Sequence, residues 1–341
     1  MIIARAPLRV SFGGGGTDLP EYYTKSGGLV FSVSIDKYIY VIVEPSRYGT
    51  QITTLDEGFQ ANQTGPPDAA GNRLPLLVTE RCAPGESVRI LIAGEVPSGT
   101  GLGSSSALTV ALVAALSELT GVKRSPVEVA ELACTIEIEQ LGSPIGKQDQ
   151  YASAVGGMNT LEFHPDGTVL VDPVHLSASI RDMLGRRLQL YFTGNRRRAG
   201  SILAQQRRQS EEGDRQTMVA LDAIKGLAID MRHAVLEGDL DRFGHLLHDS
   251  WVHKRRVASG ISTDFINHCY ETARHAGALG GKIAGAGGGG FLLLYCREES
   301  QDSLANALKP LGLVHMPFEF SSRGVHITVK DSSLDTDTWQ S

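Results

Sequence analysis

The sequence predicts a protein of mixed helices and strands that folds as two domains. The chain has 341 residues, which is long enough to bury two hydrophobic cores. Strand-like and helical apolar segments follow one another through the first half of the chain. A new strand-like segment at 188–192, after a polar stretch, marks the start of a second domain.

Composition argues against several classes of protein. The formal net charge of −6 disfavours a general affinity for nucleic acid. The longest strongly apolar run, near 107–116, is too short to span a bilayer, and the first residues do not form a signal peptide. Four scattered cysteines show neither metal-ligand spacing nor a disulfide framework. We therefore expect a cytoplasmic protein without nucleic-acid or membrane partners, for which a homodimer is possible.

The first fifty residues predict three strands and a glycine-rich turn. The strands are expected at 2–10 (broken at Pro7), 29–35 and 38–44. The turn holds four consecutive glycines, Gly13–Gly16, which bring the backbone close to another group. Asp18 is either a hydrogen-bond acceptor at that place or the N-cap of a helix after Pro20, and its neighbours favour neither interpretation.

A glycine- and serine-rich stretch, Pro97–Ala107, connects a predicted strand at 88–96 to a predicted helix at 107–119. Glycines at alternate positions let backbone N–H groups turn toward one point, and serines at a helix start leave the positive end of the dipole facing it. The pattern favours a cradle for nucleotide phosphates over an ordinary serine-capped turn. The chain lacks a Walker-type Gly-Lys-Ser/Thr, and no strand follows this helix as a dinucleotide-binding fold requires.

The next helix contains one carboxylate on its apolar side. It opens with a capping box, Ser125 to Glu128. At 100° per residue the other acids of this helix share a polar face, whereas Glu137 falls near Ala133 and Cys134. A carboxylate turned toward the interior needs a cation or a donor, so we expect Glu137 to be a metal ligand rather than an edge residue that reaches solvent.

Asp149 stands at the start of a short predicted helix, where an aspartate is most often an N-cap. In the second domain, the arginines at 196–198 follow a strand and a glycine, so one of them can reach an anionic substrate, although such runs are more often solvated. Helices are expected at about 199–237 and around Trp251, which we expect to pack in the core. The glycine-rich stretch 280–290 leads into a strand rather than a helix and is therefore not a dinucleotide fingerprint.

Three glycine-rich stretches in this order resemble those of the GHMP kinases, the family of galactokinase, homoserine kinase, mevalonate kinase and phosphomevalonate kinase. They are Ala6–Asp18, Pro97–Ala107 and Lys282–Phe291. Between them, Glu137, a Gly-x-Pro-x-Gly at 142–146, Asp149 and Gln150 match the galactokinase-like pattern. The resemblance covers nearly the whole chain.

The resemblance implies an α+β fold with the active site in the cleft between two domains. The first, at 1–183, would be a ribosomal-protein-S5-domain-2-like α/β domain. The second, at 184–330, would be a ferredoxin-like GHMP domain, followed by a polar tail at 331–341.

The resemblance also implies a role for each site residue. Asp149 would take the proton of the acceptor hydroxyl or orient it, and Arg9 would lower the pKa of that hydroxyl. Mg²⁺ would be held by Ser105 and Glu137, with the two neighbouring serines as alternatives. ATP would be bound by Pro97, Gly99, Thr100, Gly101, Leu102, Gly103, Ser104, Ser105 and Ser106. The acceptor sugar would be bound by Gly14, Gly15, Thr17, Asp18, Arg196, Gly287 and Gly288.

Within the family, Gly13–Pro20 is most similar to the kinases of D-glycero-D-manno-heptose 7-phosphate; galactokinases carry Gly-Glu-His-Thr-Asp-Tyr at this place. This similarity implies phosphorylation of the anomeric hydroxyl to a 1,7-bisphosphate for GDP-heptose and surface polysaccharide. The arginines at 196–198 suit an acceptor that already carries a phosphate. The alternatives are a kinase of an unphosphorylated sugar, such as fucose, galactose or a heptose, and a non-catalytic nucleotide- or sugar-sensing relative.

Overall fold

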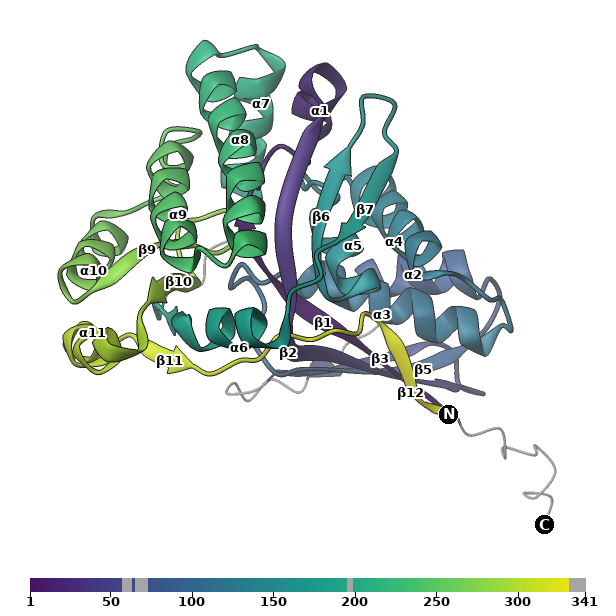
Figure 1. The fold of residues 1–341 in the computed structure, drawn as a ribbon. Coiled ribbons are helices and arrows are strands. Elements are labelled where there is room, and N and C mark those ends of the chain that lie inside the picture. The colour runs from purple at the N-terminus through teal and green to yellow at the C-terminus, as the bar shows by residue number, and fades with distance from the viewer. Residues whose placement is uncertain (57–62, 65–72, 195–198, 331–341) are drawn as a thin grey trace.

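The computed structural model describes residues 1–56, 63–64, 73–194 and 199–330, and within these ranges the chain forms two β-sheets of eight and four strands (Figure 1). The strands of the larger sheet are β1 (Ile2–Gly13), β2 (Gly28–Pro45), β3 (Gln51–Asp56), β4 (Gln63–Thr64), β5 (Val88–Gly94), β6 (Met158–Phe163), β7 (Val169–Pro173) and β12 (His326–Lys330). Their order is β12-β1-β2-β5-β3-β4, and β6 joins β2 to β7.

The long strand β2 organises the larger sheet. The sequence predicts two strands here, but the structure has one strand of 18 residues. It pairs with β1 along one edge, while on the other edge its first part pairs with β6 and its last part with β5. The predicted break at Pro7 is also wrong, because β1 runs through it with a shift of register between Pro7 and Arg9.

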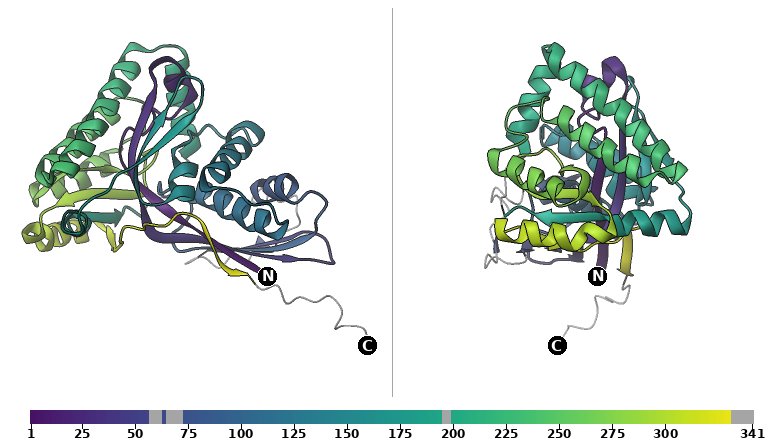
Figure 2. Two further views of the ribbon diagram at one scale, coloured as in Figure 1. Left: turned by 45° about the vertical axis from the view of Figure 1, so that its right-hand side comes forward. Right: turned by 60° about the vertical axis from the view of Figure 1, so that its left-hand side comes forward.

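Helices cover the β1–β2 pair on both sides (Figure 2). On one side, α3 packs on both strands and is apolar on nearly every face because α2, α4 and α5 surround it. On the other side, α8 packs on the same two strands. The helices of the first part of the chain are α1 (Pro20–Ser26), α2 (Arg73–Cys82), α3 (Ser104–Leu119), α4 (Pro126–Cys134), a π-helical turn η2 (Thr135–Gln140), α5 (Gln148–Val155) and α6 (Ala178–Arg187).

The smaller sheet has the ferredoxin-like arrangement that the family resemblance implies. Its strands are β8 (Leu188–Phe192), β9 (Ala278–Ile283), β10 (Phe291–Cys296) and β11 (Val314–Met316), in the antiparallel order β11-β8-β10-β9. Its helices are α7 (Ala199–Glu211), α8 (Arg215–Glu237), α9 (Leu240–Lys254), α10 (Asp264–His275) and α11 (Gln301–Leu308), with 3₁₀ turns η3 (Glu298–Ser300) and η4 (Lys309–Leu311). Trp251 is buried in the core, as predicted.

The two parts of the chain are joined by the larger of two hydrophobic clusters. It runs from β1, β2 and α3 through α8 and α9 to β10, while the smaller cluster lies almost entirely in the second part. The last strand, β12, returns to pair with β1 in the larger sheet. The predicted boundary between residues 183 and 184 falls inside α6 and stays a prediction, and the predicted polar tail lies outside the described residues.

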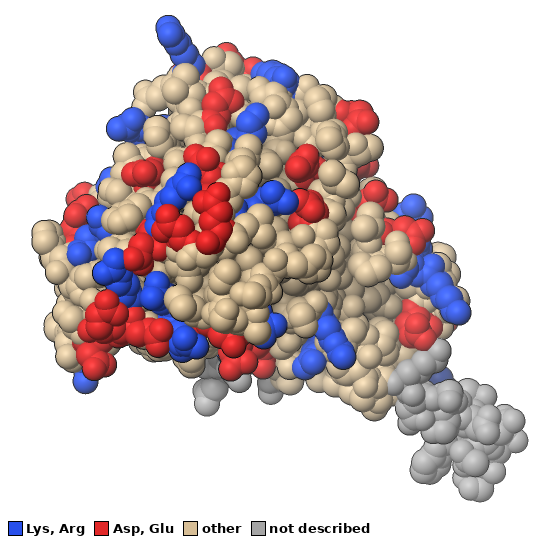
Figure 3. Space-filling view, viewed as in Figure 1, with Lys and Arg blue, Asp and Glu red and all other residues tan. Residues whose placement is uncertain are grey.

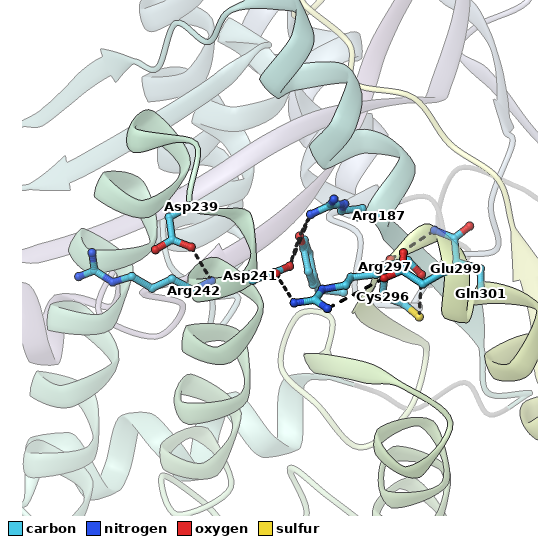
Figure 4. A network of polar contacts seen from close by, with 9 residues as sticks. Arg187, Asp239, Asp241, Arg242, Cys296, Arg297, Glu299 and Gln301 are labelled. Atoms are coloured by element: carbon cyan, nitrogen blue, oxygen red, sulfur yellow. Dashed lines mark hydrogen bonds and ion pairs between the residues drawn. The ribbon is translucent and has the colours of Figure 1, made fainter.

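Charged side chains of both signs are interspersed over the face shown in Figure 3. One polar network ties α9 to the end of β10 and to α6 (Figure 4). Asp241 accepts hydrogen bonds from Arg297 and from the Tyr295 hydroxyl, and it pairs with Arg187 at 3.5 Å. These charged groups are partly exposed, so each ion pair contributes at most about 1 kcal/mol to stability.

The phosphate-loop stretch and the third glycine-rich stretch meet backbone to backbone. A Cβ atom at Gly101 would lie 2.4 Å from the carbonyl oxygen of Ala284, and one at Gly290 would lie 2.2 Å from that of Thr100. The amide of Phe291 donates to the same Thr100 oxygen at 3.2 Å. Glycine is required at Gly101 and Gly290 because the two backbone segments lie too close together to leave room for a side chain.

Replacing Gly290 by alanine should therefore lower the free energy of unfolding more than the same change at Gly312. Both glycines have a left-handed φ, +90° and +77°, so alanine strains either backbone by about 1–2 kcal/mol. Only at Gly290 does the new Cβ meet another chain segment, which adds about 1–3 kcal/mol. Denaturant unfolding of the two variants measures the difference, and equal losses would show that the contact is unimportant.

Candidate active site

The phosphate loop has the backbone that its glycines predict. Gly99, Gly101 and Gly103 all have a left-handed φ, between 76° and 88°. Helix α3 begins at Ser104 rather than at Ala107, so the three serines form its first turn and Gly103 is the N-cap. The first N–H groups of the helix have no partner within it, and the positive end of its dipole faces the cavity that these serines line. This arrangement suits an anionic phosphate chain.

Arg9 joins the first glycine-rich stretch to the phosphate loop and to Asp149. Its amide donates to the carbonyl of Leu102 at 3.0 Å, and its Nη1 donates to that of Gly101 at 2.7 Å. Its Nε and Nη2 approach Oδ1 of Asp149 at 2.8 and 2.7 Å. Arg9 is buried, whereas Asp149 remains 24% exposed. The arginine therefore fixes the carboxylate while leaving it open to the cavity.

Asp149 is not a helix cap, which decides between the two interpretations of its sequence position. The N-cap of α5 is Lys147, and no side chain caps the helix. Asp149 lies in the first turn instead and lines the same cavity as the phosphate loop. The geometry suits a group that accepts or orients a proton of a bound hydroxyl.

Glu137 is fully buried, as its place on the helical wheel predicts. It lies in the π-helical turn that extends α4, a distortion often found at functional sites. The Ser105 hydroxyl donates to its Oε1 at 3.0 Å and the Gln150 amide to its Oε2 at 2.8 Å. Burial nevertheless raises the pKa of Glu137 to about 7, because these donors only partly replace the lost hydration.

Asp18 is buried and its carboxylate accepts hydrogen bonds from the backbone of the first glycine-rich stretch and of the segment before α5. The amides of Gly16 and Gln148 donate to its two carboxylate oxygens at 2.9 and 3.3 Å, and burial raises its pKa. It is not the N-cap of α1, a position that Leu19 occupies. Gly146 must be glycine here, since a Cβ atom would lie 2.0 Å from an Asp18 oxygen.

Two buried lysines that the sequence analysis did not assign to the site also line the cavity, Lys254 at the end of α9 and Lys282 on β9. Burial lowers the pKa of Lys254 to about 8 and that of Lys282 to about 7. A helical wheel of α9, like the one that identifies Glu137, would have indicated Lys254 as a buried charge. Lys254 lies on the same buried face of α9 as Leu247 and Trp251.

The predicted site residues fall into three groups. Those that line one cavity are Arg9, Gly15, Asp18, Gly99, Gly101, Gly103, Ser104, Ser105, Ser106, Glu137 and Asp149. Those that lie outside this lining are Gly14, Thr17, Pro97, Thr100, Leu102, Gly287 and Gly288. Arg196 lies outside the described residues.

Some residues that lie outside the cavity lining, such as Thr17 and Gly288, instead make hydrogen bonds that hold the glycine-rich stretches in place. The hydroxyl of Thr17 donates to the Gly14 and Leu29 carbonyls, which closes the glycine turn. The amide of Gly288 donates to Ile261 at 2.8 Å and therefore fixes the third glycine-rich stretch against the loop before α10.

Comparison with known proteins agrees with this geometry. The GHMP kinases N terminal domain matches residues 74–157, and the GHMP kinases C terminal domain matches residues 231–311. The D-glycero-alpha-D-manno-heptose 7-phosphate kinase of Campylobacter jejuni is 32% identical over 95% of this chain and 98% of its own length. The chain belongs to the GHMP kinase family. It is therefore an enzyme of the phosphotransferase class, with ATP as donor and a hydroxyl group of a small molecule as acceptor.

Two further relatives share most of this chain. A D-glycero-D-manno-heptose 1-phosphate kinase from Bacteroides thetaiotaomicron has the same fold, with a TM-score of 0.79 and 29% identity over 97% of this chain and 100% of its own. This likeness confirms the predicted α+β fold. The L-fucokinase/L-fucose-1-P guanylyltransferase of Bacteroides fragilis is 25% identical over 87% of this chain and 35% of its own length. In the described part of this GHMP kinase, no helix is long and apolar enough to cross a membrane.

Replacing Glu137 by glutamine should change the pH dependence of stability. The raised pKa means that the ligand-free folded protein holds a proton that the unfolded chain has lost, so stability falls as pH rises from about 4.5 to 7. The glutamine side chain is neutral, so its burial does not require the desolvation of a charge. At pH 8, without metal or nucleotide, the variant should therefore be more stable than the wild type by about 1–3 kcal/mol. The difference should vanish below about pH 4, where the side chain is protonated in both states. Denaturant unfolding across this range measures it, and a difference that is independent of pH would contradict the account.

Proposed function

We propose that this GHMP kinase transfers the γ-phosphoryl group of ATP to the anomeric C1 hydroxyl of D-glycero-D-manno-heptose 7-phosphate, giving the 1,7-bisphosphate. The observation that carries the proposal is the position of Asp149, held by Arg9 in a cavity that the phosphate loop lines on one side and Gly15 and Asp18 line on another. The end-to-end similarity to the Campylobacter jejuni enzyme supports the choice of acceptor.

The chain's own residues supply the chemistry of the transfer. Asp149 accepts the proton of the C1 hydroxyl or orients that hydroxyl toward the γ-phosphorus. The Arg9 guanidinium holds this carboxylate in place and offsets the charge that develops on the attacking oxygen. The backbone and serines at the start of α3 hold the triphosphate, and Asp18 and the glycine turn contact the sugar.

The residues around Glu137 fit a magnesium ion bound together with ATP. The site offers a buried carboxylate and the Ser105 hydroxyl, both hard oxygen donors, next to the expected phosphates. Among the described residues no group of three or more His, Cys, Asp or Glu side chains could hold a metal, so the remaining ligands would be phosphate oxygens and water. When bound, the ion neutralises phosphate charge.

Other features of the protein remain proposals. We place ATP binding and Asp149 in a domain at 1–183 and the third glycine-rich stretch in a domain at 184–330. Arg196, Gly287 and Gly288 stay predicted substrate contacts. Four buried free cysteines and the use of ATP support a cytoplasmic location, and the product would enter GDP-heptose and surface-polysaccharide synthesis.

A kinase of an unphosphorylated sugar is the second candidate, supported by the similarity to the Bacteroides fragilis fucokinase. The arrangement of Arg9, Glu137 and Asp149 around one cavity opposes a non-catalytic sensing role.

Product analysis distinguishes these functions. The purified chain is incubated with Mg·ATP and, separately, with D-glycero-D-manno-heptose 7-phosphate, the unphosphorylated heptose, L-fucose and D-galactose. We expect the heptose 7-phosphate to give the highest kcat/KM and a bisphosphate whose new group NMR places on C1. A higher kcat/KM for a neutral sugar would favour the second candidate, and no turnover of any acceptor would favour the sensing role.

A further inference from the structure

Lys254 and Lys282 reach from the second part of the chain to the first glycine-rich stretch. The Nζ of Lys254 donates to the Gly15 carbonyl at 2.9 Å and approaches Oε1 of Gln206 at 3.4 Å. The Nζ of Lys282 donates to the carbonyl of Ser11 at 3.0 Å. The two side chains are only 7% and 5% exposed, yet both line the cavity beside the expected sugar-binding turn.

Neither ammonium group has an acidic partner among the described residues, where no carboxylate oxygen lies within 4.0 Å of either Nζ. Asp18 attracts Lys254 electrostatically, but its oxygens accept hydrogen bonds from the Gly16 and Gln148 amides. An unpaired buried charge destabilises a fold by several kcal/mol. Consistent with this, burial and mutual repulsion lower the pKa of Lys282. An anion bound beside the two lysines would remove this imbalance.

A separate observation indicates a ligand at the same place. The hydroxyl of Ser11 is buried, lines the cavity and has no hydrogen-bond partner, and the same holds for Oε1 of Gln148. Buried polar atoms in native proteins are almost always paired, so an orphaned hydroxyl beside two ammonium groups suggests a bound oxyanion.

We propose that Lys254 and Lys282, with the Ser11 hydroxyl, bind the phosphate that the acceptor sugar already carries. This inference rests on the proposed function and deepens it, because it gives the preference for a sugar phosphate a structural basis. A phosphate monoester carries a charge near −2 at neutral pH, which two ammonium groups match, whereas a neutral sugar leaves both uncompensated. The hydrogen bonds described for the two ammonium groups go to β1, the glycine turn and α7, and none goes to residues 97–106. This placement favours the acceptor's phosphate over the γ-phosphate of ATP.

The test compares Lys254→Met and Lys282→Met with the wild type on heptose 7-phosphate and on the unphosphorylated heptose. Lys225→Met is the matched control, because its Nζ also donates to backbone carbonyls, those of Ser26 and Gly27, but it does not line the cavity. We expect kcat/KM for the phosphorylated acceptor to fall by roughly 30-fold or more in each cavity variant. The KM for ATP should change less than about threefold, the activity on the neutral heptose should fall much less than that on heptose 7-phosphate, and the control should match the wild type.

Equal losses on both acceptors would overturn the proposal and show that the lysines only hold the glycine turn. A raised KM for ATP alone would assign them to the γ-phosphate and overturn it as well. A second measurement is independent of turnover: inorganic phosphate should raise the Tm of the wild type and of Lys225→Met in the presence of Mg·AMP-PNP, and should do so less in the cavity variants. If the wild type does not phosphorylate heptose 7-phosphate, the proposed function fails, and this phosphate effect decides the anion site by itself. An equal rise in all four proteins would overturn it.

Discussion

The hydrogen bonds of Arg9 hold the active site together. One buried side chain on β1 bonds the phosphate loop through the Gly101 carbonyl and the catalytic candidate Asp149 through its carboxylate. Its amide adds a bond to Leu102. Because segments far apart in the chain meet at Arg9, the position of Asp149 relative to the phosphate loop is set by the fold. A planar, permanently charged group with several donors is suited to this task, and a lysine could not make all of these bonds at once.

Much of the site could be predicted from the sequence because an acidic residue on the apolar face of a helix, or a cluster of glycines after a strand, stands out from its neighbours. Glu137 stood out on its helical wheel, and the alternate glycines of the phosphate loop required a left-handed backbone that the structure contains. The capping box at Ser125 is also present. These signals are local, since each depends on residues within one or two turns of chain. The ferredoxin-like sheet, in contrast, was predicted from resemblance to a family.

Features that depend on tertiary contacts could not be predicted in this way. Nothing near Pro7 shows that β1 continues through it, because a shift in pairing with β2 accommodates the missing amide. Of the third glycine-rich stretch, Gly285 lines the cavity as expected, whereas Gly290 packs on Thr100 and Gly287 on Ile261. The burial of Lys282 could not be predicted from the neighbouring glycines, because the segments that bury it are distant in sequence. The burial of two lysines without acids makes sense only when the cavity and its expected anionic ligand are considered together.

We propose that Asp149, positioned by Arg9, acts on the acceptor hydroxyl, and every other part of the site serves this step. The most direct measurement is the single-turnover rate of phosphoryl transfer to heptose 7-phosphate by Asp149→Asn, with the affinity for ATP determined on the same protein. Asparagine keeps the size of the side chain but cannot accept the proton, so the account predicts a rate lower by roughly 100- to 10,000-fold with nearly unchanged ATP affinity. A variant that transfers the phosphoryl group at close to the wild-type rate would contradict it.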